Sequence, residues 1–165
     1  MTLSEYLAGY SPNEVIDLPE SSWGNGGKHY VWCNPETEWF WPYIDEAERL
    51  MESAVKRFVP SAGLVCGLLN QAARELLLLE SSDWLFLVTT RQAKEYASQR
   101  FLLHYQRFRN LISMLEKGEF GEKEINYLEE IEEIDNLFPE IDYHIFSSRE
   151  KVYSPQSRWN HRDEE

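Results

Sequence analysis

The sequence has few of the residues that usually carry catalysis or covalent cross-links. Its 165 residues include two cysteines, Cys33 and Cys66, and four histidines scattered along the chain. The two cysteines have neither metal-binding nor redox spacing, so we expect reduced thiols and a cytoplasmic protein. The sequence contains no nucleophile elbow, no phosphate-binding loop and no His-Glu-x-x-His zinc motif. We therefore expect no catalytic residue, no metal and no cofactor in this chain.

Basic residues are also scarce. Sixteen lysines and arginines face 29 acidic residues, which gives a formal net charge of −13. Such a field repels phosphate backbones and anionic membrane surfaces, so neither nucleic acid nor a membrane is an expected partner, whereas neutral ligands remain possible. No apolar run approaches the roughly 20 residues of a membrane helix, and the first residues lack the pattern of a signal peptide.

Helical spacing of apolar residues dominates what is present. We expect one all-α domain, because no strand pattern recurs often enough to build a sheet. A capping box at Thr2 and Glu5 predicts a short first helix that ends near Gly9. Four main helices are then expected, from Pro42 to about Val59, from a cap at Ser61 to Glu80, from a cap at Thr89 or Thr90 to Gly118, and from Glu122 to Ile134.

This pattern defines the expected domain organisation. Residues 1–146 form one helical domain, in which residues 1–33 are a long ordered loop region rich in aromatic residues and glycine and residues 34–146 are the helical bundle. The most apolar helix should be the central one. Residues 137–146 are expected to be extended and to pack along the bundle. The polar tail, residues 147–165, is expected to be disordered.

Tryptophans cluster around the glycine-rich turn. Four of the six lie within nineteen residues: Trp23, Trp32, Trp39 and Trp41. Rings at a helix start are most often core residues, which we expect of Trp39 and Trp41. Trp23 and Trp32 flank the turn, and two explanations remain open for them. They either staple the loop onto the bundle or stack on the apolar faces of a sugar.

Three long motifs then follow one another: LPESSWGNGGKHYVWCNPETEWFWPYIDEAERLM, LLNQAARELLLLESSDWLFLVTTRQAKEYASQRFLLHYQRF and DNLFPEIDYHIF. In this order they resemble the C-terminal helical domain of glycoside hydrolase family 57 enzymes, of the 1,4-alpha-glucan branching type. The resemblance extends from about Leu3 to Phe146. Ser21 stands where the family usually has glycine and Cys33 where it has an aliphatic residue, and neither touches a proposed ligand group.

The resemblance implies that the chain is part of an enzyme and lacks the catalytic part. In the family, a β/α barrel upstream carries a glutamate nucleophile and an aspartate acid/base, and the reaction retains anomeric configuration. The helical domain is implied to close over this barrel and to lend Trp23 and Trp32 to the cleft that binds α-1,4-glucan. There they would hold the glucan and exclude water, so that the sugar passes to another sugar hydroxyl.

Three further residues are candidates for the same surface. His29 lies between the two tryptophans and either donates to a sugar hydroxyl or braces the loop. Asp83 and Trp84 lie at the break between two long helices, where an aspartate also fits an ordinary helix cap. A polar set in the most apolar helix is instead expected to form a satisfied hydrogen-bond network: Asn70, Gln71, Arg74 and Glu75.

Several functions therefore stay open. The first is a substrate-binding domain of an α-glucan branching enzyme, which forms α-1,6 branches in glycogen-like or starch-like glucan. The second is the same domain in a 4-α-glucanotransferase or α-amylase of the family. The others are a free-standing glucan-binding module and a purely structural helical domain.

Overall fold

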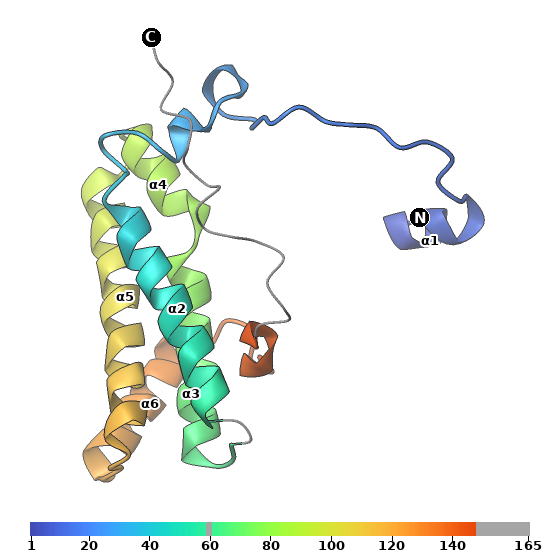
Figure 1. Cartoon of the computed structure of the whole chain (residues 1–165). Helices are drawn as coiled ribbons and strands as arrows, with labels where there is room; N and C mark the ends of the chain where they lie inside the picture. The colour runs from blue at the N-terminus through green and yellow to red at the C-terminus, as the bar shows by residue number, and fades with distance from the viewer. Residues whose placement is uncertain (59–60, 148–165) are drawn as a thin grey trace.

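The structure is a computed structural model that describes residues 1–58 and 61–147. Within those ranges every regular element is helical, which confirms the predicted all-α class. Figure 1 shows the elements in space. Their bounds are α1 Leu3–Gly9, η1 Asn25–Gly27, η2 His29–Val31, α2 Phe40–Phe58, α3 Leu64–Leu79, α4 Ser82–Thr89, α5 Lys94–Lys117, α6 Glu122–Ile134 and η3 Tyr143–Phe146.

The central helix is α3, as its composition predicts. It packs against α2, α5 and α6, so three of its sides are covered by other helices. Leu68, Leu69, Leu76 and Leu79 on α3 are fully buried. A helix that is apolar on nearly every side gains most from this position, because each leucine leaves water completely.

Helix α2 covers one side of this core with an amphipathic face. Phe40, Ile44, Ala47 and Met51 are buried at steps of three and four residues, whereas the intervening positions are more exposed. Pro42 lies in the first turn, where its missing N–H leaves no helical hydrogen bond unmade. The helix ends at Phe58, as the sequence predicts.

The expected cap at Ser61 is wrong. Helix α3 begins at Leu64, and its N-cap is Gly63, whose φ of 60° lies in the left-handed region that favours glycine. The Ser61 hydroxyl is instead 2.7 Å from the hydroxyl of Tyr143. Ser61 therefore forms a tertiary hydrogen bond with Tyr143 and does not cap α3.

The cap expected at Thr89 or Thr90 is also wrong, because both residues belong to the end of a separate short helix, α4. Thr89 ends this short helix and Thr90 is its C-cap residue, with a hydroxyl that donates to the carbonyl of Phe86. Helix α5 begins only at Lys94, with Ala93 as N-cap. Helix α4 packs against α5 and closes one end of the bundle (Figure 1).

Several other sequence predictions agree with the structure. The capping box of Thr2 and Glu5 is present, and α6 has the predicted bounds. The segment before Ser147 lies against α2 and α3, as expected, although it ends in the 3-10 helix η3. Cys33 and Cys66 are free thiols. Residues 148–165, which make up nearly all of the polar tail, lie outside the described residues.

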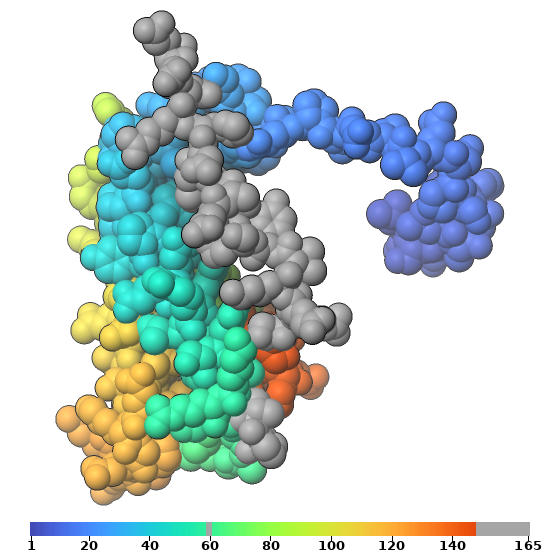
Figure 2. Space-filling view, in the orientation of Figure 1, coloured from blue at the N-terminus to red at the C-terminus, as the bar shows by residue number. Residues whose placement is uncertain are grey.

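Two features bear on the surroundings of the domain. Among the described helices, none combines the length and apolar character needed to cross a membrane. Residues 1–20 are all exposed, and Figures 1 and 2 show them as an arm that leads away from the bundle, with α1 standing apart from it.

Candidate functional site

The loop that carries the tryptophans is attached to α4 through two polar side chains. Asn34 is buried, and its amide nitrogen donates to the carbonyl of Tyr30 and to the hydroxyl of Thr89, both at 2.8 Å. The Thr89 hydroxyl in turn donates to the carbonyl of Val31 at 2.7 Å. This Asn34–Thr89 bridge fixes the loop backbone next to the helix end.

The bridge places three aromatic rings together. Trp23 lies 5.2 Å from Trp32 between ring centroids, at an interplanar angle of 78°, and 5.8 Å from Phe86 on α4. We call these three rings the aromatic platform. Trp23 is 77% exposed, whereas Trp32 is half-buried against the core. The platform therefore presents one open indole face that rests on two supported rings.

Glycine is needed where the loop crosses the platform. A Cβ on Gly24 would lie 3.0 Å from Cζ3 of Trp32 and 3.0 Å from Cγ2 of Val31. The next glycines, Gly26 and Gly27, have φ values of 66° and 74°. This turn is closed by Ser22, whose hydroxyl donates to the carbonyl of Lys28 at 2.6 Å. The glycines thus allow the backbone to pass close to the indole.

Trp32 is held from its backbone as well as its ring. Its carbonyl accepts hydrogen bonds from the indole nitrogen of Trp41 and from the hydroxyl of Thr37, both at 3.1 Å. Its own indole nitrogen is buried and has no hydrogen-bond acceptor within residues 1–58 and 61–147. The platform therefore contains a buried donor that the described protein does not use.

Trp39 and Trp41 are packing residues, as the sequence predicts. The Trp39 ring centroid is 3.9 Å from that of Phe40 and 5.6 Å from that of Phe101. Both tryptophans pack against the hydrophobic core. The Trp39 ring packs at the start of α2, and the Trp41 indole supports Trp32 through its carbonyl.

His29 lies beside the turn, at the start of η2. Its Nε2 is 3.0 Å from the carboxylate of Glu20, and both side chains are largely exposed. This contact joins the start of the loop to η2. Of the two roles left open for His29, the geometry supplies a partner for bracing, and the ring retains enough exposure to meet a ligand.

Asp83 and Trp84 are not brought to the platform. Trp84 lies within α4 and its ring faces α5. The ring centroid is 6.2 Å from that of His104 and 6.4 Å from that of Tyr96. Its indole nitrogen donates to the carbonyl of Leu78 at 2.7 Å. Asp83 is exposed in the first turn of α4, where a carboxylate interacts favourably with the helix dipole.

Phe86 is a platform member that the sequence did not predict. It lies one helical turn before Thr89, so the two side chains of α4 meet the loop at neighbouring points. Trp84, two residues away, projects about 200° around the helix. Recognition of α4 as a helix would have been the signal needed to pair Phe86 with the loop.

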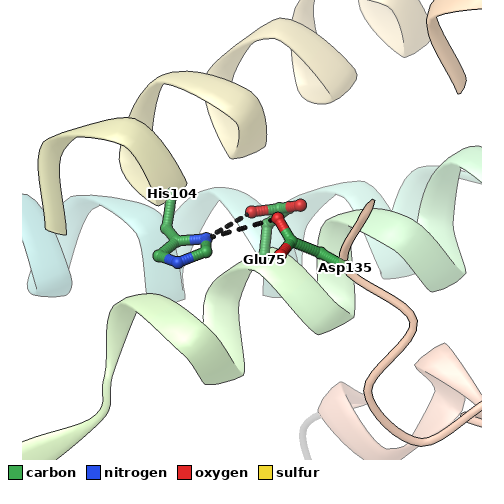
Figure 3. A group of neighbouring side chains, drawn as sticks. All are labelled: Glu75, His104 and Asp135. Atoms are coloured by element: carbon green, nitrogen blue, oxygen red, sulfur yellow. Dashed lines mark hydrogen bonds and ion pairs between the residues drawn. The ribbon is translucent and has the colours of Figure 1, made fainter. Parts of the chain in front are cut away.

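A second polar cluster lies inside the bundle, around the expected network on α3. Glu75 and His104 are completely buried, and Nδ1 of His104 is 2.8 Å from the Glu75 carboxylate (Figure 3). Gln71 donates to the other oxygen of Glu75 at 3.1 Å. Arg74 donates to Gln71 and to the carbonyls of residues 137–139, which confirms a satisfied network there. Asn70 instead accepts a hydrogen bond from the backbone N–H of Tyr143.

The protonation of His104 follows from its neighbours. Arg100 is always a donor, and its Nη2 lies 2.9 Å from Nε2 of His104, so this ring nitrogen accepts. Nδ1 therefore carries the proton and donates to Glu75. Burial raises the pKa of the Glu75 carboxyl above its usual range, against the opposing effect of the His104 hydrogen bond. His104 thus links helices α3 and α5 through its hydrogen bond to Glu75.

Asp135 completes this cluster and raises the question of a metal. Donor atoms of Glu75, His104 and Asp135 lie within 4.8 Å of one another. However, Arg107 forms an ion pair with Asp135, and both oxygens of Glu75 already accept hydrogen bonds. A guanidinium in this position opposes a divalent cation. The cluster is a buried ion and hydrogen-bond network that ties the chain after α6 to α3 and α5.

Fold and site together define a helical domain that displays an aromatic surface on a tethered, glycine-rich loop. The family described as 1,4-alpha-glucan branching enzyme, C-terminal, matches residues 43–146. The chain belongs to this family of branching-enzyme C-terminal domains.

Individual relatives agree with this assignment. The chain is 48% identical over 139 residues to a 1,4-alpha-glucan branching enzyme of Thermococcus kodakarensis, a match that covers 83% of this chain and 21% of that enzyme. The crystal structure of that GH57 enzyme superposes with a TM-score of 0.80 at 45% identity, over 90% of this chain and 27% of the other.

Two further solved structures are similar. A GH57-type branching enzyme from Pyrococcus horikoshii gives a TM-score of 0.76 at 42% identity, over 94% of this chain and 30% of that one. An α-amylase from Thermotoga maritima gives 0.70 at 32% identity, over 90% and 26%. The chain therefore spans between about a fifth and a third of the length of each of these relatives.

Proposed function

We propose that this chain is the glucan-binding C-terminal domain of an α-glucan branching enzyme, and that the aromatic platform is its contact with the polymer. The observation that carries the proposal is the 77% exposure of Trp23 on a loop that Trp32 and Phe86 support. A large indole face left in water gains when an apolar surface covers it, and the C–H faces of a glucose ring provide one.

The electrostatics of the chain suit a neutral polymer. Its net charge of −13 disfavours anionic ligands and leaves uncharged sugars unaffected. The same loop also offers a polar group for a sugar hydroxyl, the half-exposed ring of His29. The indole N–H of Trp32 is buried and is not open to a sugar on this surface. Aromatic stacking combined with a few polar groups is the usual composition of a small-ligand site.

In this proposal the chemistry takes place elsewhere in the parent polypeptide. The two carboxylates of a retaining mechanism lie on the catalytic barrel that the family resemblance implies, and this domain closes over it. The platform then holds the glucan against the barrel and limits the access of water. Transfer to a sugar hydroxyl, which creates an α-1,6 branch, is favoured over hydrolysis.

The contribution of the Trp23 face to glucan affinity follows from the area that a sugar ring covers. If one sugar ring covers roughly 60 Å² of the Trp23 face, burial at about 25 cal/mol per Å² contributes about 1.5 kcal/mol, or roughly tenfold in affinity. We expect Trp23→Ala to weaken binding of maltoheptaose by this factor. Trp84→Phe should leave the affinity unchanged, because Trp84 lies between α4 and α5.

A nitrogen–proton NMR titration of maltoheptaose into the chain tests the proposal directly. Selective shifts of the Trp23 and Trp32 indole signals, lost in Trp23→Ala, would support it. If no signal shifts at millimolar ligand, the comparison moves to the complete parent enzyme. There, a Trp23→Ala variant with undiminished glucan transfer and lower thermal stability would identify a purely structural domain.

One observation favours a second activity for the parent, namely the similarity to the Thermotoga α-amylase at 32% identity. A hydrolase would release reducing ends from amylose without creating branches. A branching enzyme would create α-1,6 linkages, visible by proton NMR, with little release of reducing ends. The higher identity to the two branching enzymes supports α-1,6 branching as the activity of the parent.

A further inference from the structure

A groove lies between helices α5 and α6, which both pack against α3. Figure 1 shows α6 at the end of the bundle opposite α4. Asn110, Ser113 and Lys117 follow one face of α5, and Lys123 and Tyr127 are one turn apart on α6. We call this hollow the α5–α6 groove. Its volume of about 320 Å³ lies within the range of small-ligand sites, roughly 300–1,000 Å³.

Tyr127 forms an aromatic wall of the groove and is held in place from two sides. Its ring packs against the hydrophobic core, and its hydroxyl accepts a hydrogen bond of 3.0 Å from the side-chain amide of Asn110 on α5. A second hollow, of about 470 Å³, runs along α6 and is also lined by Lys123 and Tyr127. The ring therefore borders open space and is already fixed, so a ligand that stacks on it loses little side-chain entropy.

The polar groups around Tyr127 can both donate and accept hydrogen bonds. The contact with Asn110 uses one amide N–H, so the tyrosine hydroxyl can donate its own proton and the amide oxygen can accept. Ser113 adds a hydroxyl, and the exposed side chains of Lys117 and Lys123 add donors. Sugar hydroxyls need such a mixed set, because each of them is both donor and acceptor.

The formal charges that line the groove cancel. Two lysines face two glutamates there: Lys117, Lys123, Glu119 and Glu124. The carboxylate of Glu124 also accepts the backbone N–H of Gly121 at 3.0 Å, which caps α6. The local charge is thus zero in a chain whose net charge is −13. A neutral, hydroxyl-rich ligand fits this balance better than an anion or a cation does.

From these features we infer that the α5–α6 groove is a second glucan-binding site, in which Tyr127 stacks on a sugar ring and Asn110 and Ser113 bond its hydroxyls. The inference rests on the proposed function for the identity of its ligand, an α-1,4-glucan. The groove is remote from the aromatic platform, since Lys94 and Asn110 are about 24 Å apart along α5. A glucan long enough to reach both places would bind more tightly than either contact allows alone.

One nitrogen–proton NMR titration of maltoheptaose into the 165-residue chain reports on both places. The side-chain amide of Asn110 and the backbone amides of residues 123–127 report on the groove, and the indole of Trp23 reports on the platform. We expect both sets of signals to shift in the wild-type chain and the groove signals to keep shifting in Trp23→Ala. The isolated chain is sufficient, because every residue that lines the groove belongs to this domain.

Two variants of the groove and one control complete the test. Tyr127→Ala should weaken groove binding roughly fivefold, which corresponds to about 40 Å² of ring face covered by a sugar. Because this ring also packs on the core, Asn110→Ala is a second variant, at an exposed site. It should weaken groove binding about fivefold without lowering the melting temperature. Gln99→Ala, at an exposed site of α5 outside the groove, should change neither quantity.

Several results would overturn the inference. One is a shift of the Trp23 indole signal with silent groove signals at millimolar maltoheptaose. Another is loss of the groove shifts in Trp23→Ala, which would mean that they are transmitted from the platform. A third is a response of the groove to inorganic phosphate but not to maltoheptaose, which would make it an anion site at its lysines.

The same titration separates failure of this inference from failure of the proposed function. Groove shifts with a silent Trp23 indole would support the second site and count against a preformed platform. Silence of both sets of signals would overturn the second site, because the groove is complete in this chain, whereas the platform would still be tested in the complete parent enzyme.

Discussion

The Asn34–Thr89 bridge predicts a specific cost for loss of one hydroxyl group. Thr89→Val keeps the shape of the side chain but removes the Oγ1 that accepts from Asn34 and donates to the carbonyl of Val31. Each hydrogen bond contributes about 1 kcal/mol, and a buried donor left without an acceptor adds a further penalty. Because Asn34 is only 7% exposed, we expect a total cost of about 2–3 kcal/mol.

This cost should appear as local opening of the loop rather than as unfolding of the bundle. Helices α3 and α5 pack against each other without this bridge, so the cooperative core remains intact. The amide of Thr37, which donates to the carbonyl of Asn34 at 2.9 Å, reports on the loop. A loss of about 2–3 kcal/mol corresponds to roughly 30- to 150-fold faster hydrogen exchange at this amide.

The neighbouring threonine provides the control. Thr90 is exposed, and its hydroxyl donates to the carbonyl of Phe86 within the same helix. Thr90→Val should therefore change exchange at Thr37 by less than about threefold, as surface substitutions usually cost under 0.5 kcal/mol. Equal acceleration in the two variants, or none in Thr89→Val, would refute the assignment of Thr89 as the tether of the loop.

Three other substitutions test separate parts of the structure. Gly24→Ala should cost about 1–3 kcal/mol and shift the indole NMR signal of Trp32, because its Cβ would lie 3.0 Å from that ring. Leu76→Ala, in the buried core of α3, should cost about 2–5 kcal/mol in urea unfolding, whereas Leu102→Ala at an exposed site should cost far less. Glu75→Gln tests the raised pKa of the buried carboxyl. The folded state then retains the Glu75 proton to higher pH than the unfolded state, so wild-type stability relative to Glu75→Gln should be greatest in acid. It should fall as the pH rises from below about 4.3 through the folded pKa, and a difference that grows with pH would contradict the prediction.

Local sequence patterns were sufficient for much of the fold. The capping box of Thr2 and Glu5 and the bounds of α6 depend on neighbouring residues, and both are present. The central place of α3 follows from its composition alone. The errors occurred where tertiary contacts decide. Ser61 bonds to Tyr143 instead of capping α3, and Thr89 bonds to the aromatic loop instead of starting α5.

The same division applies to the candidate site. Trp23 and Trp32 could be paired in advance because they flank one short turn, whereas Phe86 joins them only through the folding of α4. Gln71 and Glu75 lie one turn apart on α3, so their network was visible in the sequence. Their partner His104 lies 29 residues beyond Glu75, and no local rule connects the two.

The buried network around His104 has a consequence for recombination between relatives of this domain. Its members Glu75, His104 and Asp135 come from three separate stretches of chain and meet only in the folded core. A crossover at any point between residues 75 and 135 therefore inherits some members from one parent and the rest from the other. Where the parents differ at these positions, the hybrid leaves a buried polar group without its hydrogen-bond partner, which typically costs about 1–3 kcal/mol. Segments of this domain should therefore be exchanged outside residues 75–135, at boundaries that keep the whole network from one parent.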